Sequence, residues 1–240
     1  MVSKNEIKLI KSLTQKKYRN KYLLFVAEGE KLVNELVKSR FKIKQIYTLE
    51  NRDINLDKTL VKLITEKELK KISNLVTPNS TLGVFEIPAF KKPLKGGLQI
   101  LLDGIQDPGN LGTIIRLCDW FGVSQLICSE DTVDCFNPKV VQATMGSIAR
   151  VNITYVDVES FLEKSEMPKY MTLMQGDNIY RQSFPNDAII VMGNEANGIR
   201  TSIQKLADYR ITIPKFDLGS NAESLNVATA TAVLLSEFRR

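Results

Sequence analysis

The stretch AIIVMGNEANGIR, residues 188–200, joins five apolar residues to a polar segment that Gly193 and Asn194 open. A continuous apolar run that ends in turn residues is typical of a strand buried on both faces of a sheet. Because Gly and Asn tolerate left-handed backbone, one interpretation is an ordinary strand-to-helix turn with Glu195 in solvent. The alternative is a ligand-binding loop, since ligands of parallel α/β sheets bind beyond the carboxyl ends of the strands.

The same alternation of strand and helix extends over residues 98–240. Apolar strands bounded by helices predict a mostly parallel sheet that is covered on both faces. We predict strands at 98–103, 124–129, 152–156, 170–174, 188–192 and 209–214, and helices at 111–121, 138–150, 158–165, 199–207 and 224–239.

Residues 1–90 predict a separate, smaller α/β domain. We place a linker at 91–97, because the segment PAFKKPLKGG (88–97) combines prolines, glycines and lysines with little periodicity. Residues 98–240 then form the second domain. In the first domain we predict helices at 4–13, from Gly29 through Lys38 and at 66–72, and strands at 23–27, 43–49, 60–64 and 82–87.

Positive charge is concentrated in the first part of the chain. Residues 1–97 carry a net charge of +11, whereas residues 98–240 carry −5. A clustered basic surface is typical of proteins that bind polyphosphates, because each neutralised phosphate releases counterions. The alternative is a set of solvated surface lysines, but confinement to one segment favours nucleic acid.

Several classes of protein are excluded by composition. The chain has no histidine, which excludes Ser-His-Asp and Cys-His hydrolases and His-ligated metal sites. Cys118, Cys128 and Cys135 contain no Cys-x-x-Cys pair, so we predict packing thiols and no metal. The apolar runs are too short to span a membrane and the N-terminus lacks a signal-peptide pattern, so we expect a cytoplasmic protein.

Two further loops follow predicted strands. In DGIQDPGNLGTIIR (103–116) we predict that Asn110 caps a helix and that Arg116, set among apolar residues, is buried or half-buried against a phosphate or carboxylate. An ion pair with Asp119 is the alternative. In the loop that follows residue 213, Ser224 is expected to open the last helix, which leaves Asn226 inside its first turn.

Three segments in order, DPGNLGTIIR (107–116), VMGNEANGIR (191–200) and IPKFDLGSNAESLNVATA (213–230), resemble the motifs of the SpoU (TrmH-like) branch of the SPOUT RNA methyltransferases. RNKYLLFVAEGEK (19–31) is similar to the ribosomal-protein-like substrate-binding domain found in many members. The resemblance implies methyl transfer from S-adenosylmethionine to a ribose 2′-hydroxyl of rRNA or tRNA. It also implies a Rossmann-like sheet with a C-terminal trefoil knot and an active site at a homodimer interface, with no metal, DNA or membrane involved.

The resemblance also assigns roles to individual residues. Arg116 would hold the target phosphate or the developing alkoxide; a role as general base stays open, because a guanidinium holds its proton tightly. The segment KFDLGSNAE (215–223) is about two residues longer than the compact family pattern, so contacts there are expected to shift. The implied catalytic residues are Asn110, Arg116, Glu195, Ser224 and Asn226, and the implied cofactor-binding residues are Met174, Gln175, Gly176, Gly193, Asn194, Ile213, Leu218 and Leu225.

Two other functions compete with this interpretation. A non-catalytic RNA-binding relative would keep the scaffold without transfer, but all five implied catalytic positions match. A Rossmann-type oxidoreductase would need a glycine-rich phosphate loop, and the glycines at 104, 109 and 112 do not fit that pattern.

Overall fold

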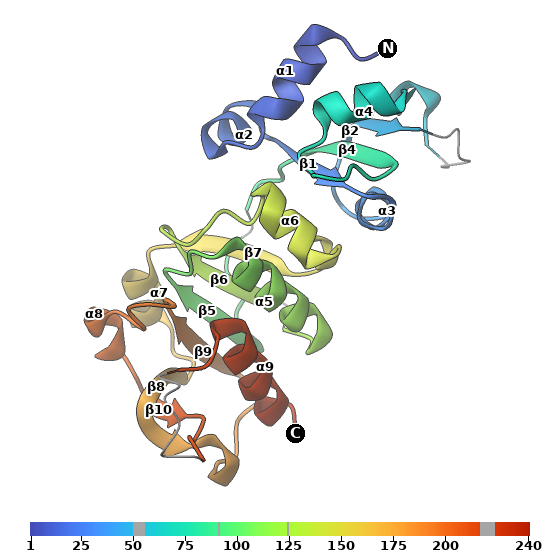
Figure 1. The fold of residues 1–240 in the computed structure, drawn as a ribbon. Coiled ribbons are helices and arrows are strands. Elements are labelled where there is room, and N and C mark those ends of the chain that lie inside the picture. Colours follow the sequence, from blue (N-terminus) through green and yellow to red (C-terminus); the bar gives the residue numbers. More distant parts are fainter. Residues whose placement is uncertain (50–55, 91, 124, 217–223) are drawn as a thin grey trace. The chain divides into compact units, whose positions relative to one another are not determined.

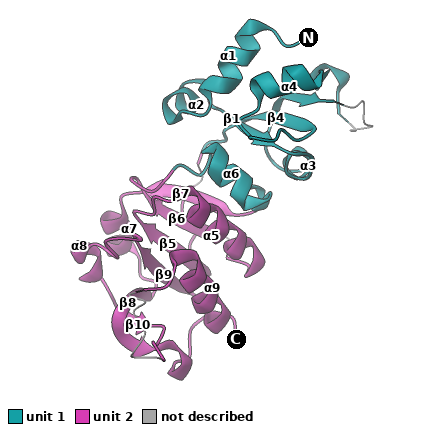
Figure 2. Ribbon diagram, viewed as in Figure 1, with its two compact units in different colours: residues 1–89, 134–149 teal, residues 90–133, 150–240 magenta. Residues whose placement is uncertain are grey.

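The computed structural model describes residues 1–49, 56–90, 92–123, 125–216 and 224–240. The chain forms two compact units (Figure 2), which are described separately. Unit 1 comprises residues 1–89 and 134–149, and unit 2 comprises residues 90–133 and 150–240. Residues 134–149 therefore pack with the N-terminal segment in the structure. The domain boundary predicted at 91–97 instead assigns them to the second domain.

Unit 1 is built on a four-stranded mixed sheet with the strand order β1-β4-β2-β3 (Figure 1). β4 pairs antiparallel with both β1 and β2, and β3 pairs parallel with β2. The strands are β1 (Leu24–Glu28), β2 (Ile43–Thr48), β3 (Val61–Leu63) and β4 (Thr81–Glu86). The helices are α1 (Lys4–Ser12), α2 (Lys16–Tyr22), α3 (Glu30–Val37), α4 (Glu66–Ile72) and α6 (Pro138–Thr144), with short 3-10 turns η1 (Lys58–Leu60) and η2 (Ser147–Ala149).

Helix α1 begins at a capping box that also ties it to the sheet. Ser3 accepts a hydrogen bond from the backbone N–H of Glu6, whose carboxylate accepts one from the backbone of Ser3. Burial opposes ionisation of Glu6, but hydrogen bonds from Lys62, Ser3 and Tyr47 lower its pKa to about 2. The acidic residue of this helix is therefore engaged within the fold.

Helix α2 was not predicted, because KKYRNKY has no apolar periodicity. Its inward side chain is Arg19, which is only 2% exposed. The guanidinium donates to the carbonyls of Leu13 and Thr14 at 2.9 Å and to Asp134 Oδ2 at 2.6 and 2.9 Å. A fully bonded arginine thus replaces the apolar residue that usually fixes a helix.

Helix α6 is shorter than the predicted helix at 138–150. It ends because Met145 takes a left-handed conformation at φ 51° and Gly146 follows at φ 99°. A Cβ on Gly146 would lie 2.9 Å from Glu35 Cβ, so this turn also needs glycine for space.

Unit 2 contains the predicted parallel sheet, with six strands in the order β10-β8-β9-β5-β6-β7 and every pairing parallel. The strands are β5 (Leu98–Asp103), β6 (Gln125–Ser129), β7 (Asn152–Val156), β8 (Lys169–Asn178), β9 (Ala188–Gly193) and β10 (Tyr209–Thr212). The helices are α5 (Pro108–Trp120), α7 (Val158–Lys164), α8 (Thr201–Gln204), α9 (Val227–Phe238) and the 3-10 turn η3 (Ile179–Arg181).

Strand β5 lies at the point where the strand order reverses. The chain first adds β6 and β7 on one side of β5 and then places β9 on the other. Ligands of such sheets bind in the crevice at the carboxyl ends of strands on either side of this point. For this chain that edge is formed by Asp103 and Gly193, which are register partners.

Both faces of the sheet are covered by helices. Residues of α7 and α8 join the core cluster that includes Leu101, Ile127, Ile189 and Val191. Helices α5 and α9 pack against each other, and Figure 1 places them on the other face. Within the part of the chain that the structure describes, no helix has the length and apolar character needed to cross a bilayer. The trefoil knot stays a prediction, because residues 217–223 between β10 and α9 lie outside the described residues.

Candidate active site

The loop after β9 is closed tightly by its own backbone. Asn194 and Gly198 exchange two backbone hydrogen bonds of 3.0 and 2.9 Å. A Cβ on Gly193 would lie 2.3 Å from backbone atoms of Gly198 and Ile199, so only glycine fits there. Glu195 is therefore held at the tip of a compact turn, and the carboxylate lies at the sheet edge.

Asn194, a predicted cofactor contact, has a structural role in the turn. Its Oδ1 accepts hydrogen bonds from the backbone N–H groups of Ala196 and Asn197 at 2.9 and 3.0 Å. Its Nδ2 donates to the Gly104 carbonyl at 2.6 Å. The side chain thereby joins the loop after β9 to the loop after β5, and a cofactor contact would have to come from its backbone.

Three predicted catalytic residues form one hydrogen-bonded chain. Asn226 Nδ2 donates to Asn110 Oδ1 at 2.8 Å, and Asn110 Nδ2 donates to Glu195 Oε1 at 3.0 Å. The Glu195 carboxylate also accepts from the backbone N–H groups of Gln106 and Asp107 at 3.3 and 3.4 Å. Residues from three distant loops thus meet at one point, with Glu195 and Asn226 exposed to solvent.

The predicted positions of Asn110 and Asn226 relative to the starts of their helices were wrong. Asp107, not Asn110, caps α5: its Oδ1 accepts from the backbone N–H of Asn110 at 2.8 Å, and Pro108 occupies the first helical position. Asn226 is not inside the first turn of α9 but caps it, accepting from Ala228 N and Thr229 N. Because Asp107 caps α5, the side-chain amide of Asn110 is free to bond Glu195. Because Asn226 caps α9 through its Oδ1, its Nδ2 is held where it donates to Asn110.

Arg116 is exposed, contrary to the prediction that it is buried or half-buried. It makes no hydrogen bond or ion pair with any residue that the structure describes. The alternative partner Asp119 instead binds Arg150, at 2.8 Å. Six residues separate Arg116 from Asn110, which corresponds to about 9 Å along the helix and a different face. The flanking apolar residues face the core, while Arg116 points away from it.

The structure adds a pair that was not predicted, Asp103 and Arg200. Asp103 is 1% exposed, and its Oδ1 accepts from both Nε and Nη2 of Arg200 at 2.6 Å. Its Oδ2 accepts from the Arg200 backbone N–H at 2.8 Å. Hydrogen bonding to Asp103 raises the pKa of Arg200. The signal in the sequence was an aspartate closing the apolar strand LQILLD, opposite an arginine closing GNEANGIR.

Several predicted cofactor residues also lie together, on β8 and after β10. The Thr212 hydroxyl lies 3.3 Å from the carbonyl of Met174 and 3.4 Å from that of Ile213, so it can donate to either. A Cβ on Gly176 would lie 2.8 Å from the Arg210 backbone, so glycine is required where β8 passes β10. Met174 and Leu225 are 67% and 52% exposed. Gln175 and Ser224 are exposed as well, and Leu218 lies outside the described residues.

Comparisons with known proteins identify the family. The SpoU rRNA Methylase family profile matches residues 97–236, and the profile of the MRM3-like substrate binding domain matches residues 4–83. The chain belongs to the SpoU rRNA methylase family. A relative of the same kind, the 23S rRNA (guanosine(2553)-2'-O)-methyltransferase RlmP of Bacillus subtilis, is 31% identical over 99% of this chain and 97% of its own length.

Solved structures of similar proteins agree with this SpoU assignment. A TrmH-family protein from Porphyromonas gingivalis matches with a TM-score of 0.89 and 38% identity, over 100% of this chain and 98% of its own. An AdoMet-bound rRNA methyltransferase from Sinorhizobium meliloti matches with a TM-score of 0.88 and 30% identity, over 100% and 96%. Both structural matches cover units 1 and 2. The predicted membership of the SpoU family, which was based on the three sequence motifs, is confirmed.

In this SpoU protein the described residues contain no cluster of three or more Cys, Asp or Glu placed to hold a metal ion. The donor set at the sheet edge consists instead of two amides, a carboxylate and backbone groups. Such groups suit the binding of a ribose and of a neutral or cationic cofactor better than phosphate, because the site contains a carboxylate and the Arg200 guanidinium at this edge is paired with Asp103.

Proposed function

We propose that this protein methylates a ribose 2′-hydroxyl of RNA with S-adenosylmethionine as the donor, and that ribosomal RNA is its substrate. The observation that carries the proposal is the hydrogen-bonded chain from Asn226 through Asn110 to Glu195, which unites all three motif loops at one edge of the sheet. The B. subtilis relative named for 23S rRNA methylation and the AdoMet-bound S. meliloti structure support it.

The donor supplies a methyl group on a cationic sulfonium. We place the donor among Met174 and Gly176 of strand β8, Gly193 at the end of β9, and Ile213 after β10, where exposed apolar and backbone groups are available. Glu195 then lies near enough to a cationic donor to favour its binding electrostatically. In the transfer an oxygen–carbon bond forms, the sulfur–carbon bond breaks and the hydroxyl proton leaves.

The chain's own residues orient the ribose and accommodate the charge that develops on its oxygen. Asn110, held from both sides, and Ser224 are suited to position the ribose. The guanidinium of Arg116 is suited to bind the adjacent phosphate or the developing alkoxide, where a fixed positive charge lowers the barrier.

Transfer of label from [methyl-³H]AdoMet to purified rRNA and tRNA tests the function. We expect label in rRNA, and after alkaline hydrolysis we expect it in a dinucleotide, because a 2′-O-methyl group blocks cleavage at its own phosphate. The non-catalytic alternative predicts AdoMet binding without label in either RNA. Label released as a mononucleotide would mean that a base, not a ribose, is methylated.

We infer that the protein is a homodimer whose second copy covers the exposed face of α5. Trp120, the last residue of α5, is 85% exposed, and Arg116 lies one turn before it on the same face. Large exposed aromatic side chains next to arginine are typical of the buried centre of interfaces. In this arrangement Arg116 would complete a site shared between two copies.

Trp120→Ala is expected to raise the dimer dissociation constant at least about 30-fold, because central aromatic residues contribute about 2 kcal/mol or more to an interface. Sedimentation equilibrium measures this directly. Phe90→Ala, which removes an aromatic side chain that is 49% exposed elsewhere in unit 2, is the control and should leave the constant unchanged. A wild-type protein that sediments as a monomer at high concentration would contradict the proposed dimer.

The proposed function also includes a cytoplasmic location, with neither DNA nor a membrane as partner.

A further inference from the structure

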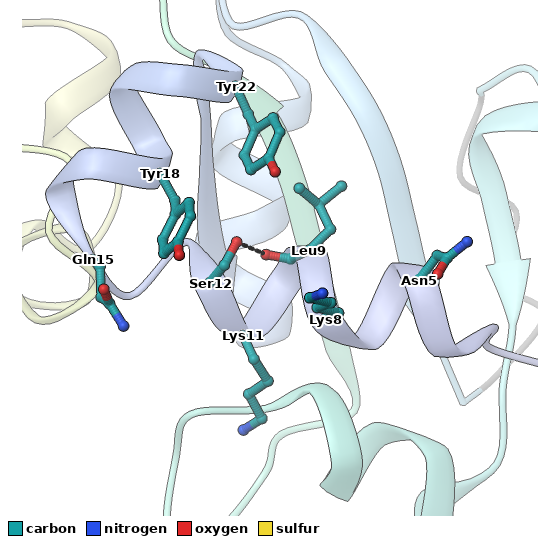
Figure 3. A pocket seen from close by; sticks show the side chains of 8 residues that line it. All are labelled: Asn5, Lys8, Leu9, Lys11, Ser12, Gln15, Tyr18 and Tyr22. Carbon is teal, nitrogen blue, oxygen red and sulfur yellow. Dashed lines mark hydrogen bonds between the residues drawn. The ribbon is translucent and has the colours of Figure 1, made fainter.

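The two N-terminal helices border an open groove in unit 1 that plays no part in the chemistry above (Figure 3). Its volume is about 520 Å³, within the range of roughly 300–1,000 Å³ that is typical of small-ligand sites. We name it the α1–α2 groove and define it by Lys8, Leu9, Ser12, Gln15, Tyr18 and Tyr22.

Two tyrosines form one wall of the α1–α2 groove. The rings of Tyr18 and Tyr22 are nearly parallel, with centroids 6.3 Å apart and 11° between their planes. Neither hydroxyl has a hydrogen-bond partner among the described residues, and Tyr22 is 42% exposed. Tyr47 of the same unit shows the contrast: it is buried and donates to Glu6 at 3.0 Å. The hydroxyls of the groove tyrosines are therefore not bonded within the described part of the chain, and a base can stack on the ring surface that neither the neighbouring ring nor a lysine covers.

Lysines accompany each ring. The Nζ of Lys17 lies 4.8 Å from the centroid of Tyr18, and the Nζ of Lys21 lies 5.3 Å from that of Tyr22. With Lys8 they are exposed, and none forms a salt bridge within the described ranges. A cation beside an aromatic ring is the arrangement that binds a stacked base together with its phosphate.

Other charges near the groove are already engaged, which leaves its field positive. Lys11 donates to the Ser73 carbonyl, and Figure 3 shows its side chain pointing away from the two rings. Glu6 is the one acidic residue of the sequence 1–23, and Lys62 binds it at 2.8 Å. The free charges at the groove are thus lysines, which favours a phosphate-bearing ligand.

We propose that the α1–α2 groove binds unpaired nucleotides of the RNA substrate. One or two bases stack on Tyr18 and Tyr22, the flanking phosphates contact Lys17 and Lys21, and the side-chain amide of Gln15 bonds a base edge. A duplex does not use this surface, because its bases are already paired and stacked. The groove therefore selects a single-stranded loop or bulge. The inference rests on the proposed function in that RNA must be the substrate.

Binding of the full-length protein to a fluorescein-labelled 12-nucleotide RNA, alone and annealed to its complement, tests the inference by anisotropy. Tyr18→Ala with Tyr22→Ala should weaken single-strand binding at least about tenfold and leave the salt slope unchanged. Tyr22→Ala alone, at the more exposed position, should weaken it several-fold. Tyr18→Phe with Tyr22→Phe should bind like the wild type, because phenyl rings stack equally well.

Lys17→Gln with Lys21→Gln should weaken binding and also reduce the salt slope by about 1.4, the value expected for two phosphates of a single strand. The matched control, Lys70→Gln with Lys71→Gln, removes the same charge from exposed positions on α4 and should change neither quantity. An equal loss of slope in this control would mean that the lysines act only through net charge and would overturn the site.

Two further outcomes overturn the groove: wild-type protein that binds the duplex as tightly as the single strand, or tyrosine-to-alanine variants that bind as the wild type does. Methyl transfer by the wild type is measured in parallel. Transfer without any effect of the tyrosines refutes the groove alone, whereas tyrosine-dependent binding without transfer refutes the proposed function alone.

Discussion

Arg116→Ala is expected to reduce methyl transfer about 100- to 1,000-fold, the usual loss when one charge-stabilising group is removed from a reaction centre. Cofactor binding should change little, because the proposed seat lies on β8, β9 and the segment after β10. Stability should also be kept, since Arg116 is exposed and makes no hydrogen bond or ion pair within the described part of the chain. Single-turnover transfer to rRNA and AdoMet calorimetry separate these quantities.

Arg116→Lys is the matched variant for this prediction. It keeps the positive charge but replaces a planar fork of donors by a single ammonium group, so an intermediate rate is expected. If the lysine variant is as slow as the alanine variant, the fork itself is required to bind a phosphate or alkoxide. Turnover by Arg116→Ala within about twofold of the wild type would remove this residue from the catalytic group.

The parallel sheet could be predicted from the sequence because its strands are continuous apolar runs. The runs at 98–103 and 152–156 coincide with β5 and β7, and β5 is buried along its whole length, as a central parallel strand requires. Helix α2 could not be predicted in the same way, because it depends on Arg19 and Asp134, which are 115 residues apart in the chain. The pattern of residues within a short stretch of sequence does not reveal a contact with a residue so far along the chain.

The proximity of three candidate site residues could be predicted more accurately than their geometry, and their catalytic roles stay predictions. Motif order identified Glu195, Asn110 and Asn226, but nothing local fixed which residue caps a helix. Asp107 before Pro108 was the stronger capping signal, and it displaced Asn110 to a position from which its amide reaches the acid. The exposure of Arg116 depends on which face of α5 meets the sheet, and apolar neighbours in sequence do not decide that.

The loop that bears Glu195 is anchored at both ends to the end of β5. Asn194 holds the Gly104 carbonyl at its first residue, and Arg200 binds the buried Asp103 carboxylate at its last. Movement of either anchor would displace the Glu195 carboxylate from Asn110 and from the backbone donors that face it. The Asp103–Arg200 pair is thus suited to position the acid.

Arg200→Ala is accordingly expected to lower both stability and transfer. It leaves a carboxylate that is 1% exposed with only the backbone N–H of residue 200. Loss of a partner to a buried charge costs about 3–5 kcal/mol, and we expect about 2 kcal/mol because the Arg200 side chain is half-exposed. Urea unfolding measures this cost. Transfer, assayed well below the melting temperature, should fall at least about tenfold, the effect of a reacting group displaced by a fraction of an ångström.

A double-mutant cycle distinguishes this positioning role from a general loss of stability. Asp103→Asn with Arg200→Ala should cost little more than Arg200→Ala alone, because residues of one pair are strongly coupled. Arg200→Lys should recover part of the stability but little of the transfer rate, since one ammonium cannot reproduce the Nε and Nη2 contacts with Oδ1. Additive costs, or a transfer rate that follows stability alone across the three variants, would show that the pair holds the fold together without placing Glu195.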